Sequence, residues 1–176
     1  MSYFKLVFLI CFIISSHLFS QLSGNSTLSV NLPIVTLMDI EPTGAISMNF
    51  TAPTEAGVAI VSPATNTTKW INYTSAITSS GATRKITASV NPVISGVDIK
   101  IQAAAASGAG GGTLGTPTSQ VTLNTTSQTI ISGIGGAFTG NGVNNGHRLT
   151  ISLSTNTYAN LSRTNTPVVI VYTITE

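Results

Sequence analysis

The sequence predicts an all-β protein whose antiparallel strands form a sandwich or a barrel, of which we take the sandwich as the expectation. Apolar and β-branched residues alternate with small polar residues at period two through most of the chain. Turn-forming pairs such as Asn141-Gly142 and Asn145-Gly146 separate these segments. Charged residues make up only 7% of the 176 residues, against about 25% in ordinary soluble domains, which excludes a coiled coil and a charged disordered chain.

The first element is predicted to be a secretory signal peptide, residues 1–20. Lys5 is the only charge before an uninterrupted apolar run over residues 6–14, and we place cleavage after Ser20. The run is shorter than the about 20 apolar residues that cross a bilayer. Cys11 lies inside it behind Ile10, where a lipid-attachment motif has a small residue, so we interpret Cys11 as part of the removed segment.

Removal of this segment leaves residues 21–176, which we expect to form a single domain. The mature chain has no cysteine and therefore no disulfide, and it holds no second apolar stretch of membrane-spanning length. We expect an exported protein of the periplasm, the cell surface or the extracellular space. Ten segments of this chain read as strands: residues 28–32, 34–40, 45–50, 70–74, 85–90, 97–103, 120–123, 128–132, 148–153 and 168–175.

The two terminal strands are candidates for pairing between subunits. Leu28, Val30 and Leu32 occupy alternate positions after a polar start, as strand exchange or edge pairing requires. The alternative is that this strand completes its own sheet, and the sequence leaves the two interpretations open.

The last strand carries a second set of alternating side chains. Ile170, Tyr172 and Ile174 share one face of this strand, while the opposite face, with Val169 and Val171, is still half apolar. We therefore expect this strand to be covered on both sides or paired centrally, and to complete its own sheet. The candidate assembly residues here are Ile170, Tyr172 and Ile174.

Catalytic and metal-binding groups are scarce in the mature chain. His147 is its only histidine, and its position in an Asn/Gly-rich loop favours a solvated side chain over a catalytic base. Asp39 and Glu41 share a strand face before Pro42, where surface carboxylates are the simpler interpretation than an acid–base pair or a calcium site. We expect no catalytic residue, no metal site and no cofactor.

Ligand binding through aromatic side chains remains open. Trp70 and Tyr73 are three residues apart on one predicted strand, so one should be core and the other outward. Trp70 and Tyr158 are the candidate glycan contacts. The glycine-rich residues 108–115 lack the following Lys-Ser/Thr of a phosphate loop and are predicted to be a flexible connector. The formal charge of +2 is too small and scattered to predict nucleic-acid binding.

The chain resembles secreted pilin-like sandwiches, such as the spore coat protein U group and chaperone–usher fibre subunits. The resemblance is carried by the signal peptide, by the segments at residues 70–73 and 121–124, and by the closing strand at residues 168–175. It implies an immunoglobulin-like or pilin-like β-sandwich. The sequence departs from those families in lacking a cysteine pair and in placing Tyr172 fourth from the last residue rather than next to last.

These observations predict a secreted, non-enzymatic structural or adhesive surface protein that assembles with itself or with other surface proteins. Neutral hydroxyl and amide side chains can be buried in contacts without the desolvation cost of charges. The alternatives are a small glycan- or calcium-binding module that uses Trp70, Tyr158 or the Asp39/Glu41 rim, and a hydrolase that uses the same two carboxylates.

Overall fold

The computed structural model describes residues 23–176, so the predicted signal peptide and its cleavage point lie outside the described residues. Backbone contacts place Pro33–Glu176 in one compact unit, and the described residues before Pro33 lie outside it. The two parts are described separately below. In residues 23–176 no helix is long and apolar enough to cross a membrane.

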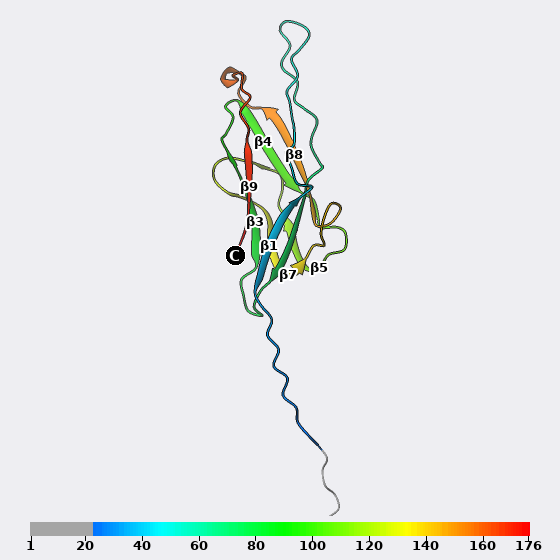
Figure 1. Cartoon of the computed structure of the whole chain (residues 1–176). Helices are drawn as coiled ribbons and strands as arrows, with labels where there is room; N and C mark the ends of the chain where they lie inside the picture. The colour runs from blue at the N-terminus through cyan, green and yellow to red at the C-terminus, as the bar shows by residue number, and fades with distance from the viewer. Residues whose placement is uncertain (1–22) are drawn as a thin grey trace, which may run out of the picture. The chain divides into compact units, whose positions relative to one another are not determined.

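The all-β prediction is confirmed. The described residues form nine strands and one 3-10 turn, and every strand pairing is antiparallel (Figure 1). The elements are β1 (Val35–Glu41), β2 (Trp70–Ala76), β3 (Arg84–Asn91), β4 (Val97–Ala103), β5 (Gly111–Pro117), β6 (Val121–Thr122), β7 (Gln128–Phe138), β8 (His147–Thr155), η2 (Tyr158–Asn160) and β9 (Val169–Thr175).

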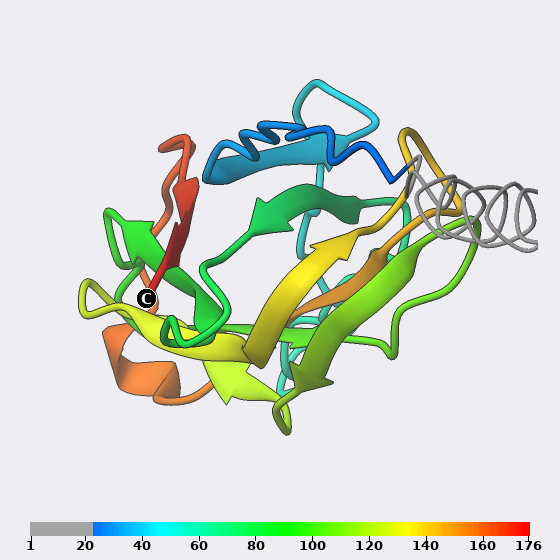
Figure 2. The same ribbon diagram turned by 90° about the horizontal axis from the view of Figure 1, so that it is seen from below.

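The strand order is β6-β4-β8-β2-β7-β3-β9, with β1 added to β2 and β5 added to β7. β4 also contacts β7, which is not its neighbour in this order, so the sheet must fold back on itself. The Val90 N–H of β3 donates to the Asn124 carbonyl, two residues past β6, at 2.9 Å. Figure 2 shows the strands of this unit arranged around an interior.

The interior is filled by the alternating aliphatic side chains that the sequence pattern predicts. On β8, Leu149 and Ile151 are buried and Leu153 is partly buried, all on the face that the alternation assigns to the core. The buried aliphatic side chains come mainly from the central strands of the order and are Ile71, Ile86, Ala88, Val90, Ile99, Ile101, Ala103, Leu123, Ile130, Ile131, Ile134, Ala137, Leu149 and Ile151.

Two predicted strands are absent. Residues 28–32 and residues 45–50 have no ladder partner within the described part of the chain, although both alternate apolar and polar side chains. The segment between β1 and β2, which contains residues 45–50, projects as a long hairpin, cyan in Figure 1, beyond the ends of β4 and β8. It has an isolated bridge between Thr51 and Val61 and another between Asn66 and Ile151 of β8. Alternation makes a segment suitable for a strand, but a ladder also needs a neighbouring edge to pair with.

One strand, β5, lies where the sequence predicted a flexible connector. The glycine-rich segment contains β5, which pairs with β7 from Gly111 to Pro117. At Gly112 φ is +85°, and a Cβ there would lie 2.2 Å from the Gly136 carbonyl oxygen. The glycines therefore allow the two backbones to approach closely, and their lack of side chains removes the alternation by which a strand is recognised.

The prediction of central pairing for the last strand is wrong. Among residues 23–176, β9 pairs with β3 alone and ends the strand order. Val169 is 60% and Val171 is 47% exposed. The predicted shared face is present, because Ile170, Tyr172 and Ile174 are half-buried while the residues between them are exposed. β9 is long and apolar as predicted, but its second apolar face, with Val169 and Val171, is open to solvent.

Candidate functional site

One open apolar concavity of the compact unit is a cleft of about 910 Å³, here called the Phe50 groove. Its floor consists of core side chains, including Ile99 of β4 and Ile151 of β8. One wall comes from residues 46–52 and the other from residues 161–168, before β9. The core is therefore not closed on this side, and its aliphatic side chains form the floor of an open groove.

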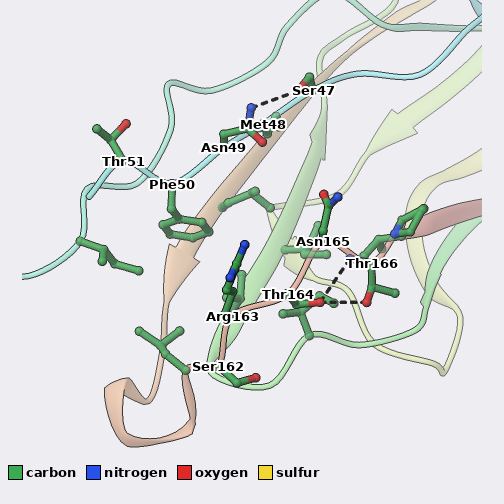
Figure 3. A pocket seen from close by; sticks show the side chains of 18 of the residues that line it. Ser47, Met48, Asn49, Phe50, Thr51, Ser162, Arg163, Thr164, Asn165 and Thr166 are labelled. Atoms are coloured by element: carbon green, nitrogen blue, oxygen red, sulfur yellow. Dashed lines mark hydrogen bonds between the residues drawn. The ribbon is translucent and has the colours of Figure 1, made fainter. Parts of the chain in front are cut away.

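The walls of the Phe50 groove differ in chemistry. Ile46, Met48 and Phe50 contribute alternate apolar side chains, and each is half-buried. Figure 3 shows Phe50 and Arg163 reaching into the groove from opposite walls. Arg163 is the only charged residue in the lining, so the groove offers apolar area with one cation at its rim.

The Arg163 wall is held by short-range hydrogen bonds. The Thr164 and Thr166 hydroxyl oxygens lie 2.8 Å apart, and the Thr166 N–H donates to Thr164 Oγ1 at 3.2 Å (Figure 3). Such local side-chain bonds give an exposed loop a defined turn without regular secondary structure.

β9 borders this groove and has a free edge. Ile170 lines the groove, and Tyr172 and Ile174 continue the same half-buried face. Burial raises the pKa of the Tyr172 phenol above its ordinary value. Because β9 pairs only with β3, the backbone groups along its other side are available for another strand.

The three candidate assembly residues at the start of the chain are exposed. Leu28 is 85%, Val30 is 69% and Leu32 is 84% exposed. The segment that carries them has no regular secondary structure. A short run of large apolar side chains with this exposure is unfavourable in water unless a partner covers it.

The two candidate glycan contacts lie in different places. Trp70 begins β2 opposite Glu41 of β1 and Arg148 of β8, and it is half-buried. Tyr73, on the other face of β2, is 3% exposed and belongs to the core. Tyr158 is 54% exposed, lines the Phe50 groove, and accepts a hydrogen bond from the Ile60 N–H at 3.4 Å. The structure therefore does not bring Trp70 and Tyr158 together as one platform.

Asp39 and Glu41 occupy alternate positions on β1, opposite Asn72 and Trp70. Asp39 Oδ1 accepts a hydrogen bond from the next residue's N–H, at 2.7 Å. Within residues 23–176 no three His, Cys, Asp or Glu side chains are grouped so that they could hold a metal ion.

His147 is fully buried, so the prediction of a solvated loop histidine is wrong. It is the first residue of β8, and its Nδ1 donates to the Ala104 carbonyl at 2.8 Å. Its Nε2 lies 3.0 Å from the Tyr73 hydroxyl, and the two rings are stacked. Burial raises the pKa of the Tyr73 phenol above its ordinary value. The Asn and Gly residues before His147 are typical of a loop, so the sequence pattern did not show that His147 already belongs to a strand.

Other buried polar groups serve the fold. The Arg84 guanidinium, 3% exposed, donates to the Val35 carbonyl at 2.7 Å and to Ser75 Oγ at 2.9 Å. The Lys69 ammonium donates to the Pro42 carbonyl and, at 2.6 Å, to the Gly44 carbonyl. The Lys69 ammonium is thus satisfied by backbone oxygens, and the Arg84 guanidinium by backbone and hydroxyl oxygens, as buried charges require.

Comparisons of the chain with protein-family models, with curated proteins and with solved structures returned no match.

Three residues that line the concavities were not among the predicted site residues. Phe50 and Arg163 line the groove, and Phe138, at the end of β7, is 52% exposed beside a smaller pocket. The alternation of Ile46, Met48 and Phe50 was visible and was interpreted as a strand. Nothing in the sequence around Arg163 or Phe138 distinguishes those two residues from other surface positions.

Proposed function

We propose that this chain is a non-enzymatic structural or adhesive surface protein that assembles with copies of itself through its edges. In this proposal, the exposed segment with Leu28, Val30 and Leu32 of one copy docks along β9 of another copy and covers the Phe50 groove. The observation that carries the proposal is an exposed, unpaired, strand-like segment in the same chain as a free strand edge beside an open apolar groove.

The chemistry of the two surfaces is complementary. Residues 23–34 contain no charged side chain, so docking them buries no ion. If the segment is extended, Leu28, Val30 and Leu32 point to one side, toward the groove, and Ser29 and Asn31 point to the other. The partner surface offers aliphatic side chains and the unpaired backbone groups of β9.

The magnitude of the apolar term indicates what else the contact needs. Full burial of the three apolar side chains contributes about 5–9 kcal/mol in total. Loss of translational and rotational freedom costs an estimated 4–15 kcal/mol. Side-chain burial alone is therefore insufficient for tight association, and backbone hydrogen bonds to the free edge of β9 must contribute.

The antiparallel nine-stranded sheet also supports an immunoglobulin-like or pilin-like sandwich as the finer architecture, since β4 and β7 contact each other without being neighbours. An exported location, in the periplasm, at the cell surface or outside the cell, rests on the predicted signal peptide. Both belong to the proposal.

Chemical cross-linking in solution tests the docking. On a Cys11→Ser background the chain has no cysteine, so Val30→Cys in one preparation and Val169→Cys in a differently tagged one can be mixed and treated with a short bismaleimide. We expect a cross-link between the two preparations. Val61→Cys, equally exposed at 55% on the projecting hairpin, replaces Val169→Cys as the control and should give none.

Charge placed on alternate positions provides a second test. Leu28→Asp with Leu32→Asp should abolish oligomers in light scattering, because the carboxylates would enter an apolar groove. Ser29→Asp with Asn31→Asp adds the same charge on the opposite side and should leave assembly intact. A chain that stays monomeric at high concentration, or a Val30–Val169 cross-link within one chain, would refute the proposal.

A further inference from the structure

A second concavity lies on the outer face of the sheet, where β1, β2 and the end of β7 meet. This cavity of about 410 Å³, here called the Phe138 pocket, is lined by Leu37, Met38, Asp39, Asn72, Tyr73, Thr74, Phe138, Gly140 and Asn141. None of the residues of the Phe50 groove contributes to it. It also contains neither Trp70 nor Tyr158.

Strand register explains how the sequence assembles this pocket. Leu37 of β1 pairs with Thr74 of β2, and Thr74 pairs with Phe138 of β7, so their side chains form one row on one face. Asp39 and Asn72 pair with each other two residues further along and share that face. The opposite face of β2, with Ile71, Tyr73 and Ser75, is the buried one.

The apolar part of the pocket is an exposed aromatic ring beside an exposed leucine. Phe138 is 52% and Leu37 is 65% exposed. An aromatic ring presents a negative face, which attracts the weakly positive C–H bonds of a ligand that lies flat on it. A phenyl ring has no polar atom of its own, so the hydrogen-bonding groups must come from its neighbours.

The polar part of the pocket combines a buried amide, that of Asn72, with an exposed carboxylate, that of Asp39. Asn72 is 5% exposed, and its Nδ2 donates to the Asn145 carbonyl at 2.6 Å. Its buried Oδ1 has no hydrogen-bond partner among the residues that the structure describes. Asp39 contributes a carboxylate at the exposed side, with Oδ1 already accepting the Ile40 N–H. Asn72 Oδ1 is fully buried, so the exposed Asp39 carboxylate is the acceptor that a ligand in the pocket can reach.

One wall is fixed in place before any ligand arrives. Asn145 Nδ2 donates to the Asn141 carbonyl at 2.7 Å, and Asn145 Oδ1 accepts the Ala109 N–H at 2.9 Å. These bonds tie the loop that carries Gly140 and Asn141 to the segment before β5. A pre-formed wall lowers the entropic cost of binding.

We infer that the Phe138 pocket binds a neutral sugar residue, with the C–H face of the ring on Phe138 and with a hydroxyl group donating to the Asp39 carboxylate. The lining excludes the main alternatives. It contains no Lys, Arg or His to neutralise an anion. It has a single carboxylate and three large apolar side chains, those of Leu37, Met38 and Phe138, which suits a hydroxyl-bearing ring better than a calcium ion.

This inference does not depend on assembly through β9, although it would supply the adhesive contact of a surface protein. The two can be tested separately, because the variant Leu28→Asp with Leu32→Asp changes no residue of the pocket. We expect that variant to bind sugar as the unchanged chain does, whether or not either of them forms oligomers.

The test uses an array of neutral glycans that end in glucose, galactose, mannose or N-acetylglucosamine, followed by calorimetry with the free sugar that binds best. Phe138→Ala should reduce affinity at least tenfold, and Phe138→Tyr should retain it within about threefold because the ring face remains. Asp39→Asn should weaken binding about tenfold, since it removes a charged acceptor. Tyr158→Ala, which removes an equally exposed aromatic outside the pocket, is the matched control and should bind normally.

Circular dichroism of each variant separates loss of binding from loss of fold, and Phe138 and Asp39 are exposed positions whose replacement should leave the spectrum unchanged. The inference is wrong if no neutral glycan binds the folded chain. It is also wrong if binding is lost in Tyr158→Ala but kept in Phe138→Ala, or if a chelator abolishes it and calcium alone binds through Asp39.

Discussion

Replacement of Gly112 by alanine tests whether close backbone approach holds β5 in the sheet. Gly112 has φ +85°, and a Cβ at this position would lie 2.2 Å from the Gly136 oxygen and 2.9 Å from the Ala137 Cα. Both neighbours are backbone atoms of the paired strand β7, so neither can rotate away. The alanine variant must therefore move β5 away from β7 or distort both strands.

The magnitude follows from two separate contributions. A residue with a Cβ in the left-handed region costs about 1–2 kcal/mol, and forcing extra volume into a packed contact adds about 1–3 kcal/mol. Gly133 provides the matched control, because its φ is +71° but a Cβ there meets nothing within 4 Å. We expect Gly133→Ala to cost about 1–2 kcal/mol and Gly112→Ala about 2–5 kcal/mol.

Denaturant unfolding followed by circular dichroism measures both variants, with amide hydrogen exchange along β5 as a local readout. The Gly112→Ala variant should lose more stability and should lose protection selectively in β5. Equal losses in the two variants, with unchanged protection of β5, would show that the close approach to Gly136 is not a feature of the folded protein.

Further predictions concern buried polar groups. Burial raises the pKa of the Tyr73 phenol, so the folded state holds this proton more tightly than the unfolded state. The resulting contribution to the free energy of unfolding is complete below about pH 10, the ordinary phenol value. Above that pH it is lost by up to about 1.4 kcal/mol per pH unit. Tyr73→Phe should flatten this dependence in unfolding curves measured from pH 8 to 11, and an unchanged slope would contradict it. Lys69→Met should cost about 1–3 kcal/mol, since two backbone carbonyls lose their donor. Lys100→Met, which breaks only the partly exposed 3.8 Å contact with Asp98, should cost less than about 1 kcal/mol by the same measurement.

The low charge content has a structural counterpart in both concavities. Arg163 is the only charged residue in the Phe50 groove, and Asp39 is the only one in the Phe138 pocket. Each surface therefore has one charged side chain at most, and in the Phe138 pocket it acts as a hydrogen-bond acceptor. Shape, apolar area and hydrogen bonding must supply most of the specificity.

The sequence by itself determined the class of fold and the faces of its strands. Period-two alternation assigned Leu149, Ile151 and Leu153 to one face, and the structure buries that face. It likewise placed Trp70 and Tyr73 on opposite faces of one strand without deciding which was core, and the structure buries Tyr73. Alternation is a local property that a backbone carries into any sheet, so local reasoning was sufficient there.

Only the tertiary structure decided which segments find partners. Residues 28–32 alternate as clearly as residues 97–103, yet only the latter lie between two other strands. The need for glycine in β5 follows from its short distance to the backbone of β7. The burial of His147 follows from its contacts with Ala104 and Tyr73. The Phe138 pocket depends on the register of three strands that are distant in the sequence. These are pairings between remote parts of the chain, and no window of neighbouring residues contains them.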